Sequence, residues 1–332
     1  MPRKDDEIMK GLVYTKPGGL EVLKILELTK PVPKDNEVLV NVKASSLNII
    51  DYERFKSLDG KMGLMPRVVN IIQGSTGKVL GCECSGVVVE VGKSVTHLKK
   101  GDEVYGRTPG VAGTGAWAEY AVMNKDHVDL KPSNLSFEES AAIPISGETA
   151  LGGIRKANIK TGQQVMVYGA SGGVGQYAIQ FAKVQGATVT GVCSTRNQDV
   201  ARSLGCDYII DYKKEDFRKV GKKFHAIIGI NGCNRISDYK KLLKDDGIFV
   251  GIGDAKQAMK ALFLSPFSKK ITTYAAPMAP VKDYLTYPKK LAESGQLKPY
   301  IDKIYPIQDA ADAIRYIVTQ HTQGKVVLSM VF

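Results

Sequence analysis

The residues best placed to do chemistry form a run of small side chains, Gly169-Ala170-Ser171-Gly172-Gly173-Val174-Gly175, directly after the apolar segment 165–168. From Val174 onward, apolar residues recur at helical spacing, at positions 174, 177, 178, 181 and 182. Glycines let a backbone approach a pyrophosphate closely, and the N–H groups at the start of a helix point toward negative charge. The order of apolar strand, glycine turn and helix therefore predicts a dinucleotide site. Its expected contacts are Ala170, Ser171, Gly172, Gly173 and Val174.

The residues after the next strand indicate which dinucleotide is bound. The expected strand 188–193 ends about 20 residues after the glycines, where a fold that binds NAD carries Asp or Glu for the ribose 2′-hydroxyl. This chain has Ser194, Thr195 and Arg196 there instead. Hydroxyl groups and a guanidinium suit a 2′-phosphate, because Arg donates charge-assisted hydrogen bonds to phosphate oxygens. NADPH is the predicted cofactor. In the alternative interpretation, Arg196 is a solvated residue at the start of a helix.

Length and composition are those of a globular enzyme with two domains. The 332 residues suffice for two hydrophobic cores, and 43% hydrophobic with 24% charged residues is ordinary for such proteins. No apolar run approaches the ~20 residues of a membrane span, and the first residues lead into no apolar core of a signal peptide. We therefore expect no transmembrane segment and a cytoplasmic protein.

The net charge bears on possible partners, and the cysteine content bears on the redox state of the thiols. The net charge is +12, from 46 Lys and Arg against 34 Asp and Glu. The basic residues form short, dispersed pairs such as Lys213-Lys214 and Lys269-Lys270 rather than one long block, so we do not expect nucleic acid as a partner. The five cysteines, an odd number without a secretory signal, are typical of reduced thiols.

The expected secondary structure changes near residue 131. Before that point short strands are expected, at 11–14, 20–28, 37–45, 84–91, 103–106 and 117–123, with a loop near 56–79. Afterwards strands alternate with helices, the strands lying at 164–169, 188–193, 208–211, 226–230 and 247–252. This alternation predicts a doubly wound parallel sheet, an α/β fold. The later elements are expected to complete the first domain: strands 271–276, 303–306 and 325–330 and helices 281–293 and 307–319. The predicted domains are thus 1–130 with 271–332, and 131–270.

Several short motifs in a fixed order resemble one known family. They are Asn48-x-x-Asp51, Gly81-x-Glu83-x-x-Gly86-x-Val88, Lys100-Gly101-Asp102, Gly115-Ala116-Trp117-Ala118-Glu119, Ala141-Ala142-Ile143-Pro144, Thr149-Ala150, the glycine loop, Leu204-Gly205-Cys206-Asp207 and Gly324-Lys325-Val326-Val327. Over nearly its whole length the chain resembles the medium-chain dehydrogenase/reductase superfamily, in particular its zinc-independent quinone oxidoreductase branch. Chloroplast-envelope quinone oxidoreductase-like proteins look similar.

This resemblance implies a GroES-like, β-rich catalytic domain and a Rossmann domain. It implies that NADPH lies across the glycine loop with its nicotinamide near Thr149 and Asn231. It also places Tyr212 near the adenosine 2′-phosphate. A homodimer is expected by resemblance, formed through sheet edges near residues 271–276.

The chain departs from the family pattern at three places. Leu151-Gly152-Gly153 stands where a bulky aromatic is usual, which suggests a looser floor under the nicotinamide. Glu83 replaces the usual Asp, and Cys82 stands where zinc alcohol dehydrogenases carry a metal-binding His. A catalytic zinc needs three protein ligands. The other ligand position, near Asn48, holds no Cys, and the four histidines, at 97, 127, 225 and 321, lie far apart in the sequence, so we expect no metal.

Without zinc, reduction of an activated electrophile is the expected chemistry. A quinone or an α,β-unsaturated carbonyl accepts hydride readily, and the protein needs only to align the partners and stabilise the developing oxyanion. Asn48 and Tyr52 are the candidate catalytic residues, as hydrogen-bond donor and proton source, with Asp51 orienting their loop. The structural alternatives are a turn for Asn48 and Asp51, packing for Tyr52 and a helix cap for Thr149.

The leading hypothesis is therefore an NADPH-dependent reductase of quinones, enones or enals, small electrophilic molecules. A reductase of enoyl thioesters is the alternative within enzymes. A non-catalytic protein that binds NADPH or RNA is the alternative from another class, favoured by the basic charge alone.

Overall fold

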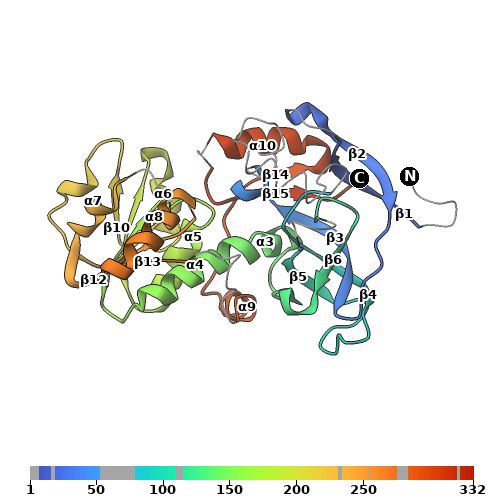
Figure 1. Cartoon of the computed structure of the whole chain (residues 1–332), viewed down its shortest axis with the longest axis horizontal. Coiled ribbons are helices and arrows are strands. Elements are labelled where there is room, and N and C mark those ends of the chain that lie inside the picture. The colour runs from blue at the N-terminus through green and yellow to red at the C-terminus, as the bar shows by residue number, and fades with distance from the viewer. Residues whose placement is uncertain are drawn as a thin grey trace. The chain divides into compact units, whose positions relative to one another are not determined.

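The computed structural model describes residues 7–15, 19–52, 79–109, 115–230, 234–253, 255–274, 283–319 and 322–332. Contacts between Cα atoms divide the chain into two compact units. The first unit contains residues 1–145 and 301–332, and the second contains residues 146–300. In Figure 1 the first unit is coloured blue to green and then red, and the second green to orange.

The first unit is built on a mainly antiparallel sheet. Among the described residues its strands follow the order β14-β15-β3-β4-β5-β7, with β6 also paired to β3 and with β1 and β2 forming a separate hairpin (Figure 1). The bounds are β1 Ile8–Tyr14, β2 Leu23–Thr29, β3 Glu37–Ser46, β4 Glu83–Val91, β5 Glu103–Arg107, β6 Tyr120–Asn124, β7 Val128–Leu130, β14 Ile301–Pro306 and β15 Lys325–Ser329. Helices α3 (Phe137–Ala141) and α10 (Ala310–Val318) accompany it.

Buried apolar residues of β3 and β4 and the fully buried Trp117 form the core of the first unit. Gly81 has a φ of 94°, and a Cβ there would lie 2.3 Å from the Trp117 ring. A glycine is therefore needed where the chain turns over this indole and enters β4.

The second unit contains a parallel sheet whose strand order is β10-β9-β8-β11-β12-β13 among the described residues (Figure 1). Its strands are β8 Gln164–Tyr168, β9 Thr188–Cys193, β10 Tyr208–Asp211, β11 Phe224–Gly229, β12 Leu243–Gly251 and β13 Ile271–Thr273. Its helices are α4 Pro144–Ala157, which begins in the first unit, α5 Gly175–Val184, α6 Gln198–Ser203, α7 Ile236–Lys240, α8 Ala255–Leu264 and α9 Thr286–Glu293. This doubly wound order has its switch point between β8 and β11, where such folds bind dinucleotides. The predicted parallel sheet is confirmed.

The two unit boundaries differ from those expected at 130/131 and 270/271. Helix α3 packs its Ala141 with Ala44 of β3 and Val327 of β15, which keeps residues 131–145 with the first unit. Strand β13 pairs with β12, Phe249 opposite Ile271, and so belongs to the parallel sheet. Local patterning could not reveal these partners, because both contacts depend on tertiary packing.

Some elements also begin later than expected. The segment 20–28 opens with a 3-10 turn at Leu20–Val22, and α10 is preceded by another at Ile307–Asp309. The expected loop 56–79 lies outside the described residues, except for its last residue.

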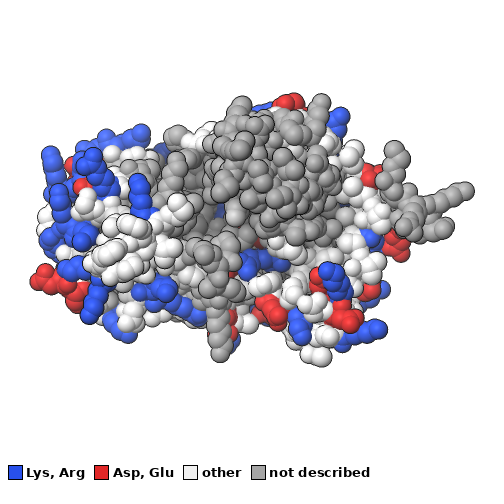
Figure 2. Space-filling view, in the orientation of Figure 1, with Lys and Arg blue, Asp and Glu red and all other residues white. Residues whose placement is uncertain are grey.

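Lys and Arg side chains are spread over both units and mixed with acidic ones (Figure 2). No helix in the described part of the chain is long and apolar enough to cross a membrane.

Candidate functional site

The glycine loop joins β8 to α5. The N–H groups of Gly169 and Ala170 both donate to the carbonyl of Val192, at 3.1 and 3.2 Å, which fastens the start of the loop to β9. Gly169 has a φ of 86°. A Cβ on Gly175 would lie 2.1 Å from the Gly169 carbonyl oxygen, so only glycine permits α5 to start this close to the strand.

The predicted cofactor contacts lie together in this loop. Ser171 is buried, and the Asn197 amide donates to its hydroxyl at 2.8 Å, which ties the loop to the turn after β9. Gly172, Gly173 and Val174 are half-buried and directly precede α5. The first N–H groups of a helix lack partners within it, so this end of α5 suits a pyrophosphate.

The carboxyl ends of β9 and β10 bring together the residues predicted to read the ribose. Asp211 pairs in register with Cys193, and the Tyr212 N–H donates to the Cys193 carbonyl at 3.2 Å. Tyr212 therefore lies beside the segment that carries Thr195 and Arg196.

The Asp211 carboxylate beside this segment already accepts two hydrogen bonds. Asp211 Oδ2 accepts from the Thr195 hydroxyl at 2.6 Å and from the Gln198 amide at 2.9 Å. The hydrogen bond from Thr195 contributes most to holding the pKa of Asp211 below its ordinary value, aided by the backbone N–H of Lys213. Asp211 thus remains charged and stabilises its own turn.

Basic and aromatic groups occupy the open side of the same site. Arg196 is exposed, and its Nε donates to Asn197 Oδ1 at 3.2 Å. Tyr212 is 45% exposed, and the Lys213 ammonium lies 5.6 Å from its ring centre. Ser194 itself is buried. This combination suits an anionic phosphate near an adenosine.

Helix α4 carries Thr149 in its interior, because the helix begins at Pro144. The alternative of a helix cap at Thr149 is therefore wrong. The neighbouring Glu148 is fully buried and accepts from the Tyr274 hydroxyl at 3.3 Å. A Cβ on Gly152 would lie 2.3 Å from the Tyr274 ring. Tyr274, from the end of β13, thus fills the space beside Gly152. The looser packing that the sequence suggested for residues 151–153 is not found beside Gly152.

Asn231, also expected near the nicotinamide, lies outside the described residues.

A buried ion pair lies in the first unit. Lys325 Nζ is 3.0 Å from Glu83 Oε1, and both side chains are almost completely buried. Glu83 also accepts from the Ser46 hydroxyl and, at 2.6 Å, from the Ile145 N–H. The Lys325 ammonium additionally donates to the carbonyl of Leu47. Charges buried this deeply are tolerated because each has several partners.

Asn48 belongs to the same network. Its Nδ2 donates to Glu83 Oε1 at 2.6 Å, and its Oδ1 accepts from Lys325 Nζ at 2.8 Å. Its backbone N–H donates to Asp51 Oδ2 at 2.8 Å, the turn that the sequence offered as an alternative. Tyr52 is half-buried and packs against the core. Sequence reasoning missed Lys325 as a partner of Asn48. The Gly324-Lys325 motif was the available signal, but it did not reveal contacts 277 residues apart.

The residues here do not fit a zinc ion. The Cys82 thiol donates to Asp51 Oδ1 at 2.9 Å, and the Glu83 carboxylate is already neutralised by the Lys325 ammonium. A divalent cation beside that ammonium would be repelled. In the described part of the chain, no group of three His, Cys, Asp or Glu side chains could hold a metal ion.

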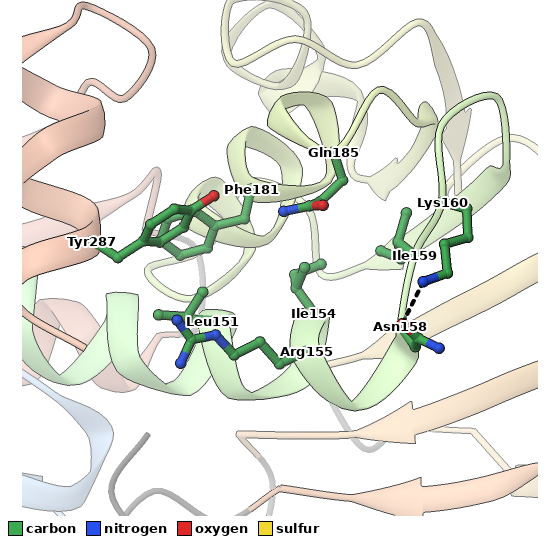
Figure 3. A pocket seen from close by; sticks show the side chains of 9 residues that line it. All are labelled: Leu151, Ile154, Arg155, Asn158, Ile159, Lys160, Phe181, Gln185 and Tyr287. Carbon is green, nitrogen blue, oxygen red and sulfur yellow. Dashed lines mark hydrogen bonds between the residues drawn. The ribbon is translucent and has the colours of Figure 1, made fainter. Parts of the chain in front are cut away.

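A cavity of about 300 Å³ also lies in the second unit (Figure 3). It is lined by Leu151, Ile154, Arg155, Asn158, Ile159, Lys160, Phe181, Gln185 and Tyr287. Phe181 and Gln185 come from the carboxyl end of α5, whereas the glycine loop precedes its amino end. This cavity is therefore separate from the glycine loop.

Comparisons with known proteins agree with this geometry. Residues 34–133 match the alcohol dehydrogenase GroES-like domain, and residues 204–328 match the zinc-binding dehydrogenase family. The chain is 32% identical to an Arabidopsis thaliana protein named NADPH-dependent alkenal/one oxidoreductase, over 96% of this chain and 79% of that protein. It is 31% identical to the chloroplast envelope quinone oxidoreductase homolog of Arabidopsis thaliana, over 97% and 98% of the two chains.

A solved structure extends the comparison to the fold. The quinone oxidoreductase from Coxiella burnetii superposes with a TM-score of 0.85 at 29% identity and covers 97% of this chain and 99% of its own. The predicted GroES-like and Rossmann architecture is confirmed. The chain belongs to the quinone oxidoreductase branch of the medium-chain dehydrogenase/reductase superfamily, a family of enzymes.

Proposed function

We propose that this enzyme is an NADPH-dependent reductase that transfers hydride to a quinone or to an α,β-unsaturated carbonyl, an enone or enal. The observation that carries the proposal is the glycine loop at α5 next to the cluster of Ser194, Arg196 and Tyr212. The names of relatives with 31–32% identity, a quinone oxidoreductase homolog and an alkenal/one oxidoreductase, support the acceptor class.

NADPH is proposed because the site offers groups for a 2′-phosphate. Arg196 and Tyr212 are exposed at the carboxyl ends of β9 and β10, and Thr195 engages the Asp211 carboxylate. That carboxylate is then not directed at a ribose hydroxyl. We expect the glycine loop to hold the pyrophosphate, with Thr149 and Asn231 near the nicotinamide.

The bound cofactor would supply the hydride, and the chain's own residues would prepare the acceptor. Glu83 and Lys325 fix both ends of the Asn48 amide. An amide has two N–H donors, so Asn48 can offer its second one to the developing oxyanion in a fixed direction. Tyr52, in the helical turn that follows Asn48, is the proposed proton source, and Asp51 holds this turn through the Asn48 N–H. We propose that the reaction proceeds without zinc, since Lys325 already neutralises Glu83.

The experiment that tests this function is oxidation of NADPH and NADH with a quinone, a medium-chain enone, an enal and an enoyl thioester. We expect fast oxidation of NADPH with a quinone, enone or enal, and no loss of activity after EDTA treatment. Turnover with the thioester alone would favour the enoyl-thioester reductase. Tight NADPH binding without turnover, or RNA affinity that falls steeply with salt, would favour the non-catalytic alternative.

We further propose a homodimer that pairs through β13. This strand is an edge of the parallel sheet among the described residues, and exposed edges are usually paired or covered. Light scattering after size-exclusion chromatography tests this assembly.

A cytoplasmic location is also proposed. The four described cysteines, Cys82, Cys84, Cys193 and Cys206, form no disulfide, which suits a reducing compartment. Burial raises the pKa of Cys193 to about 11 and that of Cys206 to about 12, so these thiols resist oxidation. Cell fractionation tests the location.

A further inference from the structure

The cavity in Figure 3 is lined by none of the residues assigned to the cofactor or the acceptor. Its volume of about 300 Å³ is at the lower end of the range of small-molecule sites. It is formed by the second half of α4, the turn 158–160, the carboxyl end of α5 and one side of α9. All nine lining residues belong to the second unit, so the cavity is complete within one compact unit.

Hydrogen bonds fix the turn at one end of the cavity. Asn158, directly after α4, has a φ of 48°, a left-handed conformation that asparagine tolerates better than most residues. The Gly162 N–H donates to the Gly186 carbonyl at 2.8 Å, and the Thr161 hydroxyl donates to the Gln185 carbonyl at 3.3 Å. The turn after α4 is thus held against the end of α5, and this part of the cavity is preformed.

The interior of the cavity is apolar and partly aromatic. Leu151, Ile154 and Ile159 are almost completely buried and contribute aliphatic surface. Phe181 of α5 is also buried, and its ring centre lies 6.0 Å from that of the half-buried Tyr287, with 34° between the ring planes. Aromatic rings attract one another at centre-to-centre separations of about 4.5–7 Å. The wall of Phe181 and Tyr287 therefore suits a further ring.

The polar groups that line the cavity are basic or neutral. Arg155 and Lys160 are exposed, and no Asp or Glu is among the nine lining residues. The Lys160 ammonium donates to Asn158 Oδ1 at 2.9 Å, the bond drawn in Figure 3. The Arg155 guanidinium lies 5.9 Å from the centre of the Tyr287 ring. Arg155 thus places a positive charge directly beside the aromatic wall.

The ends of two helices reduce this positive charge without cancelling it. A helix carries about half a negative charge at its carboxyl end. Helix α4 ends at Ala157 and α5 at Val184, both beside lining residues, so together they contribute about one negative charge against the two cations. The remaining charge is positive and favours an anion. A carboxylate suits it best, because a guanidinium offers a carboxylate two parallel N–H donors.

We propose that this cavity binds a small aromatic carboxylate, with its ring against Phe181 and Tyr287 and its carboxylate at Arg155. This site is additional to the proposed reduction. Helix α5 has 10 residues, which separates its two ends by about 15 Å. The carboxylate at one end and a pyrophosphate at the other therefore do not compete.

The test is isothermal titration calorimetry of the full chain with 1-naphthoate, with and without NADPH. We expect similar affinity in both titrations, and binding of the neutral 1-naphthamide that is weaker by about tenfold or more, because the amide lacks the charge. Arg155→Gln should weaken binding of 1-naphthoate by about tenfold to a hundredfold, since a charged hydrogen bond is lost. Tyr287→Leu should weaken it by about threefold to tenfold, because half of the aromatic wall is removed.

The matched control is Lys156→Gln, which removes a charge from the neighbouring exposed residue of α4 that does not line the cavity. It should bind 1-naphthoate as the wild type does, and both it and Arg155→Gln should keep the thermal midpoint and the rate of NADPH oxidation.

Three results overturn the proposal: absence of binding at millimolar 1-naphthoate, equal binding of 1-naphthamide, or equal weakening by Lys156→Gln and Arg155→Gln. Displacement of 1-naphthoate by NADPH also overturns it, because the probe would then occupy the proposed dinucleotide site. Absence of NADPH oxidation in the wild type would contradict the proposed reductase and leave the 1-naphthoate titration standing.

Discussion

The glycine loop of the second unit and the Glu83–Lys325 network of the first unit use polar groups in opposite ways. The loop is made of small residues, of which Gly172, Gly173 and Val174 are half-buried, and it leads directly into the first turn of α5. The network is made of side chains and is almost completely buried, and its charges are matched within the protein. We propose that the first region binds a ligand, whereas the polar groups of the second mostly hydrogen-bond to one another.

This difference separates binding residues from positioning residues. A substitution in the network should affect stability first, because it leaves a buried charge without its partner. A substitution around the loop should affect cofactor affinity first, because its partner is the ligand. Asn48 connects the two cases, because the network fixes its amide and we propose that its second N–H donates to the acceptor.

The strongest test of the comparison is removal of the buried ammonium. Lys325→Met leaves the Glu83 carboxylate buried without its countercharge and should lower the free energy of unfolding by about 3–5 kcal/mol. Urea denaturation measures this loss. Glu83→Gln combined with Lys325→Met removes both charges and should recover part of it. A loss below about 1 kcal/mol, which is the contribution of an exposed ion pair, would mean that water reaches the Glu83–Lys325 pair.

A second test addresses the ligand side. Arg196→Gln should raise the KM for NADPH about tenfold to a hundredfold, because a charged hydrogen bond to phosphate is worth about 1.5–3 kcal/mol. The KM for NADH and the free energy of unfolding should not change. The control Arg202→Gln alters a nearby exposed arginine that pairs with Asp199. An equal rise for both cofactors would show that Arg196 does not recognise the 2′-phosphate.

The third test sharpens the role of backbone packing in the loop. Gly175→Ala places a Cβ against the Gly169 carbonyl and should lower the free energy of unfolding by about 1–3 kcal/mol and weaken NADPH binding. The control is Gly172→Ala in the same loop, where a Cβ would lie 3.6 Å from the nearest atom, the Gly169 carbonyl oxygen. Denaturation and NADPH titration measure both effects. Equal losses of stability in the two variants would contradict the close approach of α5 to β8.

The two regions also differ in how far the sequence predicted them. The strand, turn and helix around Gly169–Gly175 follow one another in the chain, so local spacing was enough to predict them. The bounds of β9 and β10 were predicted without error for the same reason.

The network of Asn48 was not predictable in this way. Its partner Lys325 is 277 residues away, and no local pattern records that contact. A lysine is ordinarily a surface residue, so its burial against Glu83 appears only once β15 pairs with β3. Tyr274 beside Gly152 is a similar case, because an aromatic missing from α4 is supplied from the end of β13.

The smallest expected effect concerns the Asp211 carboxylate, which accepts hydrogen bonds from Thr195 and Gln198. Its pKa is below the ordinary 3.8, first because Thr195 donates a hydrogen bond to the charged form. A depressed pKa contributes stability that is present above the unfolded value and is lost as the pH falls through the folded value. Thr195→Val removes the donor, so the variant should lose less stability than the wild type on acidification below about pH 4. Urea denaturation between about pH 3 and 6 measures this, with Thr190→Val of β9 as the control. Identical pH profiles for wild type and Thr195→Val would mean that Asp211 owes its low pKa to its backbone and lysine neighbours, and that Thr195 is available to the cofactor instead.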